Sequence, residues 1–123
     1  MNELPESLTF RNELDTIGAQ FIANYKRGDA LACAEGYTED AIVLMPRTAP
    51  VRGRTEIAAA IQAAMGSGLQ INGFTTTHTE ADGGIGYATQ VQHTSNGDGH
   101  VMLAMRRGED GLWAICCEAV LDE

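Results

Sequence analysis

Few side chains in this sequence could carry out chemistry, and their spacing matches none of the common catalytic or metal-binding motifs. The histidines and cysteines number three each: His78, His93, His100, Cys33, Cys116 and Cys117. There is no C-x-x-C pair, H-E-x-x-H, G-x-S-x-G or glycine-rich phosphate loop, which argues against zinc, thiol redox, serine hydrolase and phosphate chemistry. We therefore predict no metal and no cofactor. Proton transfer by a carboxylate or an imidazole is the chemistry that remains.

These side chains must be positioned by helices in the first half of the chain and strands in the second. Apolar residues recur every three or four positions up to Arg27, which is the period of one helix face. After Gly66 the pattern changes to β-branched residues and period-two alternation, with turns such as Asn96-Gly97 between the runs. The predicted elements are helices over residues 7–27, 30–37 and 55–65 and strands over residues 41–45, 74–79, 85–94, 100–107 and 112–121.

Composition restricts the function classes. The chain has 123 residues, 44% of them hydrophobic, and a net charge of −9. This length and hydrophobic content predict a single domain over residues 1–123 with its own core. The negative charge argues against nucleic acid and membrane partners. An acidic start without an apolar run, and no pattern of paired cysteines, predict a cytoplasmic protein.

The order of elements resembles the nuclear transport factor 2-like superfamily, especially its small SnoaL-like and ketosteroid-isomerase-like members. The resemblance covers nearly the whole chain. Three stretches carry it: Tyr25-Lys26-Arg27-Gly28-Asp29 with Tyr37-Thr38-Glu39-Asp40-Ala41-Ile42-Val43, Val51-Arg52-Gly53-Arg54-Thr55-Glu56-Ile57, and Arg107-Gly108-Glu109-Asp110-Gly111-Leu112-Trp113-Ala114-Ile115. The resemblance implies an α+β, cystatin-like cone of three N-terminal helices packed on a curved, mostly antiparallel sheet. It does not imply one activity, because this fold carries many.

The resemblance also locates the positions that would hold ketosteroid isomerase chemistry. That reaction needs an Asp base and an oxyanion hole made of a Tyr and a protonated Asp. At the matching positions this sequence has Met45, Phe21 and Leu103. None of these side chains can accept or donate the required proton, so we predict that the protein is not a competent ketosteroid isomerase.

A pocket between the helices and the sheet is the site that the resemblance implies, and apolar concavities with a few polar groups are typical small-molecule sites. With Leu103 facing inward, alternation adds Met105 on the same strand, and the resemblance implies the wall residues on the neighbouring strands and on the helix side. The predicted pocket residues are Ile17, Phe21, Met45, Arg47, Met65, Thr89, Val91, Leu103, Met105, Cys116 and Val120. Alternatives stay open for two of them, because Thr89 also suits an ordinary strand position and Arg47 also suits pairing with surface acids.

His93 and Glu118 are the candidate catalytic pair. The resemblance turns His93 inward, and an outward-facing Trp113 would turn Glu118 inward by alternation along the last strand. A carboxylate and an imidazole in an apolar cavity are typical of a functional site. The alternatives are that His93 is exposed beside the hairpin turn and that a one-residue shift of register turns Glu118 to solvent.

Two functions from different classes follow. The protein binds a small hydrophobic molecule, or it is a SnoaL-like or isomerase-like enzyme that acts on a small carbonyl compound by general acid/base catalysis. The sheet face away from the helices carries Met102, Ala104 and Ala119, which is too apolar to remain in water. We therefore predict a homodimer joined through this outer face.

Overall fold

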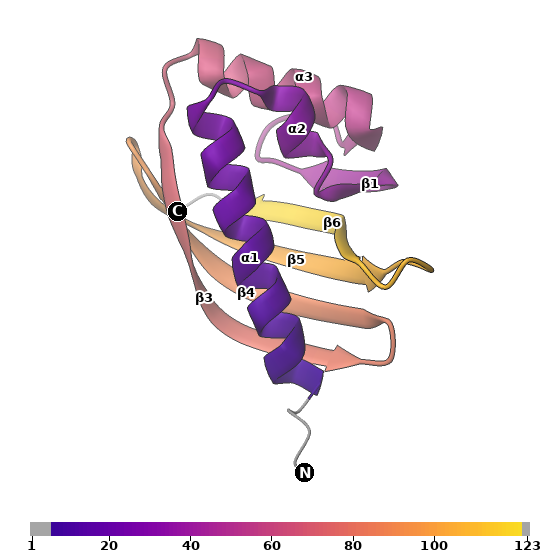
Figure 1. Cartoon of the computed structure of the whole chain (residues 1–123). Coiled ribbons are helices and arrows are strands. Elements are labelled where there is room, and N and C mark those ends of the chain that lie inside the picture. Colours follow the sequence, from indigo (N-terminus) through magenta and orange to yellow (C-terminus); the bar gives the residue numbers. More distant parts are fainter. Residues whose placement is uncertain (1–5, 122–123) are drawn as a thin grey trace.

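The computed structural model has three helices packed on one face of a curved six-stranded sheet (Figure 1), which confirms the predicted α+β architecture. It describes residues 6–121, with side chains from residue 8 onward. The helices are α1 (Glu6–Lys26), α2 (Ala30–Ala34) and α3 (Gly53–Gly66). The strands are β1 (Tyr37–Leu44), β2 (Val51–Arg52), β3 (Ile71–Asp82), β4 (Ile85–Thr94), β5 (Gly97–Arg107) and β6 (Trp113–Leu121).

The sheet has the strand order β2-β1-β6-β5-β4-β3. Strands β3 to β6 form an antiparallel meander, as the turn sequences predict. Strand β1 joins this meander by pairing in parallel with β6. It begins at Tyr37, four residues before the predicted start, because α2 ends at Ala34 rather than continuing to Tyr37. Tyr37 is therefore a strand residue that lies beside the last strand of the sheet.

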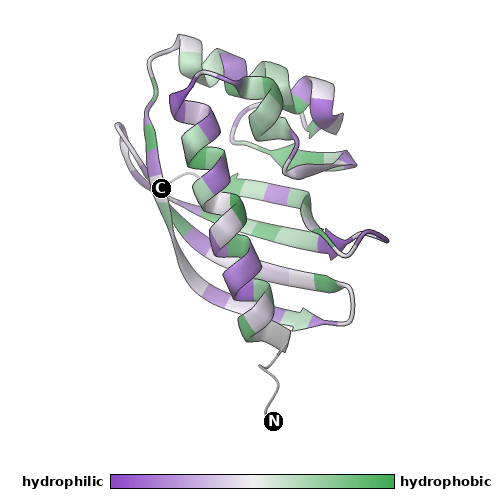
Figure 2. Ribbon diagram, viewed as in Figure 1, coloured by the Kyte–Doolittle hydropathy of each residue, from purple (hydrophilic) through white to green (hydrophobic). Residues whose placement is uncertain are grey.

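Helix α1 crosses the inner face of the sheet, defined here as the face that the helices cover (Figure 1). Phe10 and Leu14 on this helix are almost completely buried. The ring of Phe10 lies directly over Gly86 of β4, at 2.9 Å from the point where a Cβ atom would stand. The inner residues of β4 are thus small where α1 comes close. Figure 2 shows that β6 is largely apolar, as are the second half of β1 and the middle of β5, whereas the turn between β5 and β6 is hydrophilic.

Strand β6 contains a bulge that changes which face its residues occupy. Met105 of β5 pairs with Ile115, and the preceding residue Ala104 pairs with Cys117. Cys116 is therefore the extra residue, and the alternation of side chains is reset across it. Trp113 and Ile115 face inward before the bulge, where Trp113 is 8% exposed and its ring lies 4.9 Å from that of Phe10. The prediction that Trp113 packs on the outer face is wrong.

Candidate functional site

A cavity of about 1240 Å³ lies between α1, α2 and the inner face of the sheet. Its apolar wall comes from α1 above and from the inward residues of β5 and β6 below. These apolar lining residues include Leu14, Ile17, Phe21, Val101, Leu103, Trp113 and Ile115. Polar and charged side chains are at least as numerous in the lining, and those on the strands include Tyr37, Gln90, Gln92 and Glu118. An apolar surface with polar groups at defined places is typical of a small-molecule pocket.

Tyr37 and Glu118 form the central polar pair of the cavity. The Tyr37 hydroxyl donates a hydrogen bond to Glu118 Oε1 at 2.8 Å. Helix α2 positions Tyr37, because Asp29 caps that helix by accepting a hydrogen bond from the Ala32 amide at 3.0 Å and the chain then turns directly into β1. The bulge at Cys116 positions Glu118, which pairs with Leu103 and shares its inward direction. Tyr37 and Glu118 thus come from β1 and β6, which are neighbours in the sheet through their parallel pairing.

Burial shifts the proton affinity of both groups. Desolvation raises the pKa of Glu118 above its ordinary value of 4.5, and the hydrogen bond from Tyr37 opposes that rise in part. Desolvation, with the nearby Glu118 carboxylate, also raises the pKa of the Tyr37 hydroxyl well above 10.0. Tyr37 therefore remains a neutral donor at physiological pH. Glu118 is a group that can give a proton when neutral and accept one when ionised.

A second polar group lies on β4, on the other side of β5. Gln90 is only 5% exposed, and its Nε2 donates to Thr76 Oγ1 at 3.2 Å. The Thr76 hydroxyl in turn donates to Asp15 Oδ1 of α1 at 3.3 Å, and Arg11 donates to the Thr76 carbonyl at 3.1 Å. This network links α1 to β3 and β4. It fixes the Gln90 amide at one end of the cavity.

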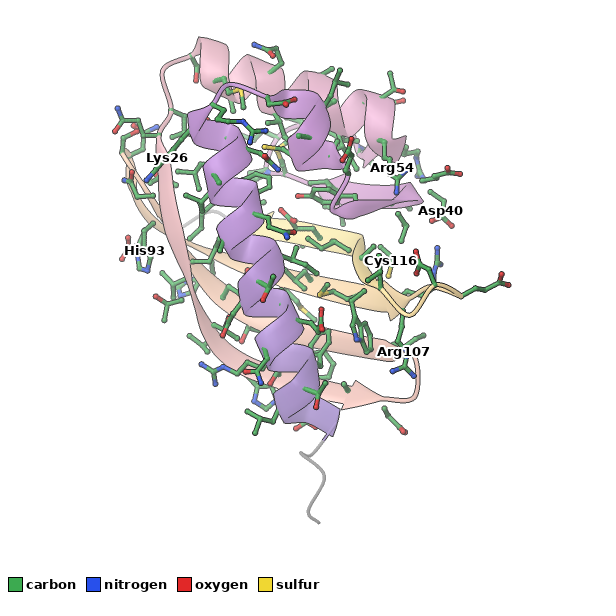
Figure 3. All side chains as sticks on the ribbon, viewed as in Figure 1. Lys26, Asp40, Arg54, His93, Arg107 and Cys116 are labelled. Carbon is green, nitrogen blue, oxygen red and sulfur yellow. The ribbon has the colours of Figure 1, made fainter. Side chains whose placement is uncertain are left out.

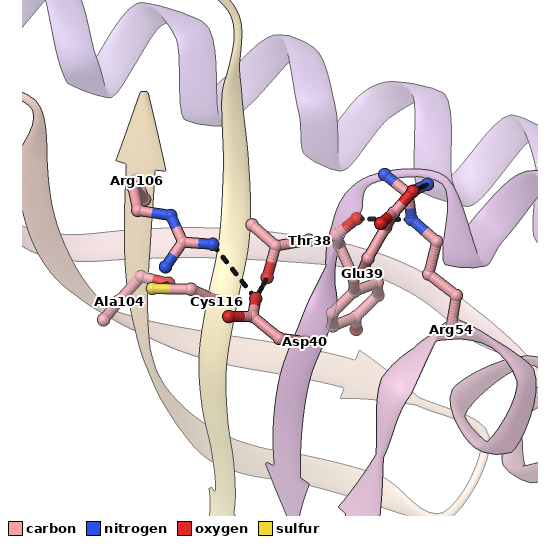
Figure 4. Close-up of polar contacts among 8 residues, drawn as sticks. Thr38, Glu39, Asp40, Arg54, Ala104, Arg106 and Cys116 are labelled. Carbon is pink, nitrogen blue, oxygen red and sulfur yellow. Dashed lines mark hydrogen bonds and ion pairs between the residues drawn. The ribbon is translucent and has the colours of Figure 1, made fainter. Parts of the chain in front are cut away.

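Charged residues surround the cavity where it reaches the surface near the start of β1 (Figure 4). Arg106 Nη2 lies 3.0 Å from Asp40 Oδ1, which also accepts a hydrogen bond from the Thr38 hydroxyl at 2.7 Å. These contacts lower the pKa of Asp40. The hydrogen bond from Thr38 is the largest single cause, followed by the contact with Arg106. Arg54 Nε donates to the Tyr37 carbonyl at 2.8 Å. Arg54 thereby holds the β1 segment that carries Tyr37.

His93 does not face the cavity. Figure 3 shows it on the side of the sheet away from α1. There its Nδ1 lies 2.9 Å from Asp98 Oδ1 and its Nε2 lies 2.7 Å from Thr75 Oγ1. The prediction that His93 shares the pocket with Glu118 is therefore wrong. The three outer residues join β3, β4 and β5 by hydrogen bonds on an open surface of the sheet.

The error extends along β4, because one register choice decides every side chain of a strand. Thr89 and Val91 share the outer face with His93, and the Thr89 hydroxyl lies 2.7 Å from that of Thr77. The residues that face inward are Gly86, Ala88, Gln90 and Gln92. The prediction took the inward side of this strand from the family resemblance, whereas the close approach of α1 requires the side with small residues.

The other predicted pocket residues divide into cavity wall and surrounding core. Ile17, Phe21 and Leu103 line the cavity. Met105 is completely buried, and Met45 and Val120 pack against the same core. Met65 packs in a second apolar cluster around Tyr25, Cys33 and Ile71. Cys116 lies at the bulge, where its thiol donates to the Ala104 carbonyl at 3.5 Å. Arg47 is exposed in the loop after β1, with a φ angle of 62°.

Sequence reasoning did not select Tyr37, Gln90 and Gln92 as pocket residues. Tyr37 lies within the stretch that carries the family resemblance. However, packing of its aromatic ring between the helices and the sheet explains a tyrosine at this position equally well. Gln90 and Gln92 alternate with Thr89, Val91 and His93, so the same pattern with the opposite phase identifies them. Across the described residues, no group of three or more His, Cys, Asp and Glu side chains could hold a metal ion. No helix within residues 6–121 is long and apolar enough to span a membrane.

No protein-family model matches the sequence, and no curated protein matches it either. Solved structures do match. A domain of unknown function with a cystatin-like fold from Nostoc punctiforme is 17% identical, with a TM-score of 0.79 over 92% of this chain and 76% of that chain. A nuclear transport factor 2-like protein with a cystatin-like fold from Novosphingobium aromaticivorans is 23% identical, with a TM-score of 0.72 over 94% and 84%. A ketosteroid isomerase-like protein from Erwinia carotovora atroseptica is 12% identical, with a TM-score of 0.69 over 98% and 100%. The predicted resemblance is therefore confirmed for the fold: this chain has the cystatin-like fold of nuclear transport factor 2-like proteins.

Proposed function

We propose that this protein binds a small, uncharged and mostly apolar molecule in the cavity between α1 and the sheet. The observation that carries this proposal is the hydrogen-bonded pair of Tyr37 and Glu118, which lines the cavity together with the apolar side chains of Leu103 and Ile115. A buried carboxyl group is costly to desolvate unless it is used or paired. Tyr37 engages one oxygen of Glu118, and the second oxygen is available to a ligand.

The charge of the protein favours an uncharged ligand. The net charge is −9, and Glu118 adds a further negative charge inside the cavity when it is ionised. A ligand carboxylate or phosphate would be repelled by both. A hydroxyl or carbonyl group has no such cost, and either can form a hydrogen bond with a carboxyl group.

Two measurements test the proposal. Native mass spectrometry of freshly purified protein should reveal a bound small molecule. N-phenyl-1-naphthylamine, an uncharged dye whose fluorescence increases in apolar surroundings, should bind with one molecule per chain. Ile17→Trp fills the cavity from α1 and should weaken dye binding at least tenfold. The matched control is Val91→Trp, which adds the same side chain to the outer face and should leave dye binding unchanged. Equal binding by both variants, or no binding by the parent, contradicts the proposal.

A second candidate function is general acid/base catalysis on a small carbonyl compound. The observation that favours it is the raised pKa of Glu118 beside a tyrosine donor, since catalytic acids and bases are tuned in this manner. Incubation of the protein with 2-tetralone in D₂O tests it, because a base would exchange the protons next to the carbonyl. Proton NMR should show exchange that Glu118→Gln slows by about 10²-fold. Exchange at the same rate with both proteins rules this function out.

A further inference from the structure

The polar groups of the cavity lie at two separate places with an apolar strip between them. Glu118 on β6 pairs with Leu103 of β5, and Gln90 on β4 pairs with Val101 of β5. Leu103 and Val101 both line the cavity. From β6 to β4, the sheet side of the cavity thus presents a carboxyl group, then two aliphatic side chains, then an amide.

The distance between the two polar groups follows from the register. Glu118 and Gln90 are two strands apart, and their partners on β5 are two residues apart. With strands about 4.8 Å apart and a rise of about 3.3 Å per residue, their backbones are separated by about 12 Å. The two side chains extend inward from their strands. A molecule of about two fused or linked rings therefore spans the space between them.

Both groups have hydrogen-bonding capacity that the protein does not use. Within residues 6–121, Glu118 Oε1 accepts from Tyr37 and Gln90 Nε2 donates to Thr76, and no contact engages Glu118 Oε2 or Gln90 Oε1. Every fully buried side-chain nitrogen and oxygen of the described residues has a partner, so these two atoms are not fully buried, and both residues line the cavity. Gln92, one inward position further along β4, has an amide that also lines the cavity without a side-chain partner among the described residues.

The chemistry of the two ends is different. Glu118 offers a carboxyl oxygen that accepts from a hydroxyl when ionised and donates to a carbonyl when neutral. Gln90 and Gln92 offer amides, each of which can donate and accept, so either a hydroxyl or a carbonyl satisfies them. In both places a ligand without a polar group would leave the protein group without a partner, which is costly in a closed site. The apolar strip between them contacts the body of the ligand.

We propose that the ligand is an elongated, uncharged molecule with an apolar body and a hydroxyl or carbonyl group at each end, held by Glu118 at one end and by Gln90 with Gln92 at the other. This inference rests on the proposed binding function and narrows it to one class of molecule. A ligand of this class lies along the β4 to β6 direction, beneath Phe21 and Ile17 of α1.

Three probes of the same shape test the inference: biphenyl, 4-hydroxybiphenyl and 4,4′-dihydroxybiphenyl. Each competes against N-phenyl-1-naphthylamine for the unmodified protein. We expect 4,4′-dihydroxybiphenyl to displace the dye at a concentration at least tenfold below that of biphenyl, since one well-formed hydrogen bond at each end is sufficient for this difference. Each hydroxyl group loses hydrogen bonds to water on binding, which by itself would make 4,4′-dihydroxybiphenyl the weakest of the three probes. Tighter binding of this probe therefore requires hydrogen bonds to the protein.

A variant then assigns the second anchor. In Gln90→Leu/Gln92→Leu, 4,4′-dihydroxybiphenyl should bind no better than 4-hydroxybiphenyl, while biphenyl should bind at least as tightly as it does to the parent, because leucine leaves no amide without a partner. The matched control is Thr89→Val, an outward-facing change on the same strand, which should preserve the full series. If the double variant does not fold, the three affinities of the unmodified protein still decide the first half of the inference, and Gln92→Leu alone decides the second.

The outcomes separate this inference from the function on which it rests. Equal displacement by all three probes overturns the two-ended ligand and leaves the binding function standing. A benefit from the first hydroxyl but none from the second shows that only one end anchors the ligand, which also overturns the two-ended ligand. Failure of the dye itself to bind overturns the proposed function, and the inference with it.

Discussion

Ile115 and Glu118 point to the same face of β6, although a regular strand would place residues three apart on opposite faces. The bulge at Cys116 between them accounts for the difference. It allows one strand to place Trp113 and Ile115 beneath α1 and still bring a carboxyl group into the cavity. The pairing of Glu118 with Tyr37 follows from this single extra residue, and the chemistry of the site depends on it.

Glu118→Gln should make stability less dependent on pH. The folded protein raises the pKa of Glu118, so above pH 4.5 the unfolded chain releases a proton that the folded chain retains. Stability is thus fully present below this value and is lost as the pH rises through the raised pKa. The neutral variant avoids that loss. Its melting temperature relative to the parent should increase between pH 4 and pH 8, and the exposed control Glu109→Gln should show no such trend. A constant difference across this range would contradict the prediction.

His93→Ala should leave the binding site intact. His93 contacts Asp98 and Thr75 on the outer face and has no contact with the cavity. We expect dye affinity within twofold of the parent. The free energy of unfolding should fall by about 0.5–1 kcal/mol, the usual range for exposed polar pairs across strands. A tenfold loss of affinity at unchanged stability would be incompatible with this geometry.

Gly86→Ala should destabilise the fold by about 1–3 kcal/mol, the typical cost of overpacking a filled core. The added Cβ would stand 2.9 Å from two ring atoms of Phe10 and 3.0 Å from the Glu80 carbonyl. Phe10 is fully buried, so a displaced ring would have to move against other core side chains. Gly73→Ala on β3 is the matched control, because its Cβ meets nothing within 4 Å. Chemical denaturation of both variants measures the difference, and equal stabilities would show that α1 can shift.

Met102→Glu should convert a homodimer into a monomer. The outer face of the sheet carries Met102 at 51% exposure and Tyr87 at 42% exposure, beside the exposed Cys117. A two-fold contact through this face, burying about 800 Å² on each chain, would cover these residues. Sedimentation velocity at micromolar concentration should give a dimer for the parent and a monomer for the variant. A monomeric parent at this concentration would refute the expected homodimer.

The unmodified protein should not isomerise a 5-ene-3-keto steroid. The positions that correspond to the base and the oxyanion donors hold Met45, Phe21 and Leu103, and loss of one oxyanion donor alone costs about 10²–10³ in rate. Phe21 and Leu103 line the cavity as apolar wall, and Met45 packs against the core. The absorbance of the conjugated product gives a direct assay. Turnover that Glu118→Gln abolishes would show that Glu118 replaces the missing base.

The sequence predicts the elements of this fold better than the faces they present. Periodicity locates α1, and the turn sequences locate the meander from β3 to β6. An inward-facing Leu103 predicts by alternation that Val101 and Met105 also face inward on β5, and all three side chains are buried. These features depend on neighbouring residues and on strongly apolar patterns, which a single sequence displays directly.

The phase of β4 and the bulge in β6 depend on contacts between distant elements. On β4 either set of alternate residues could face inward in the sequence pattern. Only the close approach of Phe10 to Gly86 decides which set faces α1. On β6 an outward Trp113 and a regular strand would also have turned Glu118 inward. The actual strand has an inward Trp113 and a bulge, so the two departures from the prediction cancel at Glu118. Neither departure has a local sequence signal.

The parallel pairing of β1 with β6 has a consequence for the order in which the protein is assembled. The hydrogen bond from Tyr37 to Glu118 joins residues 81 positions apart, and β6 separates β1 from β5 in the sheet. Contacts of such long range form late, after more local structure has closed the intervening chain. During synthesis, β1, β2 and the strands β3 to β5 are made before β6, the strand that unites them in the sheet. The cavity therefore gains its carboxyl group and its tyrosine donor in one final docking step, and a nascent chain cannot hold a ligand there before that step.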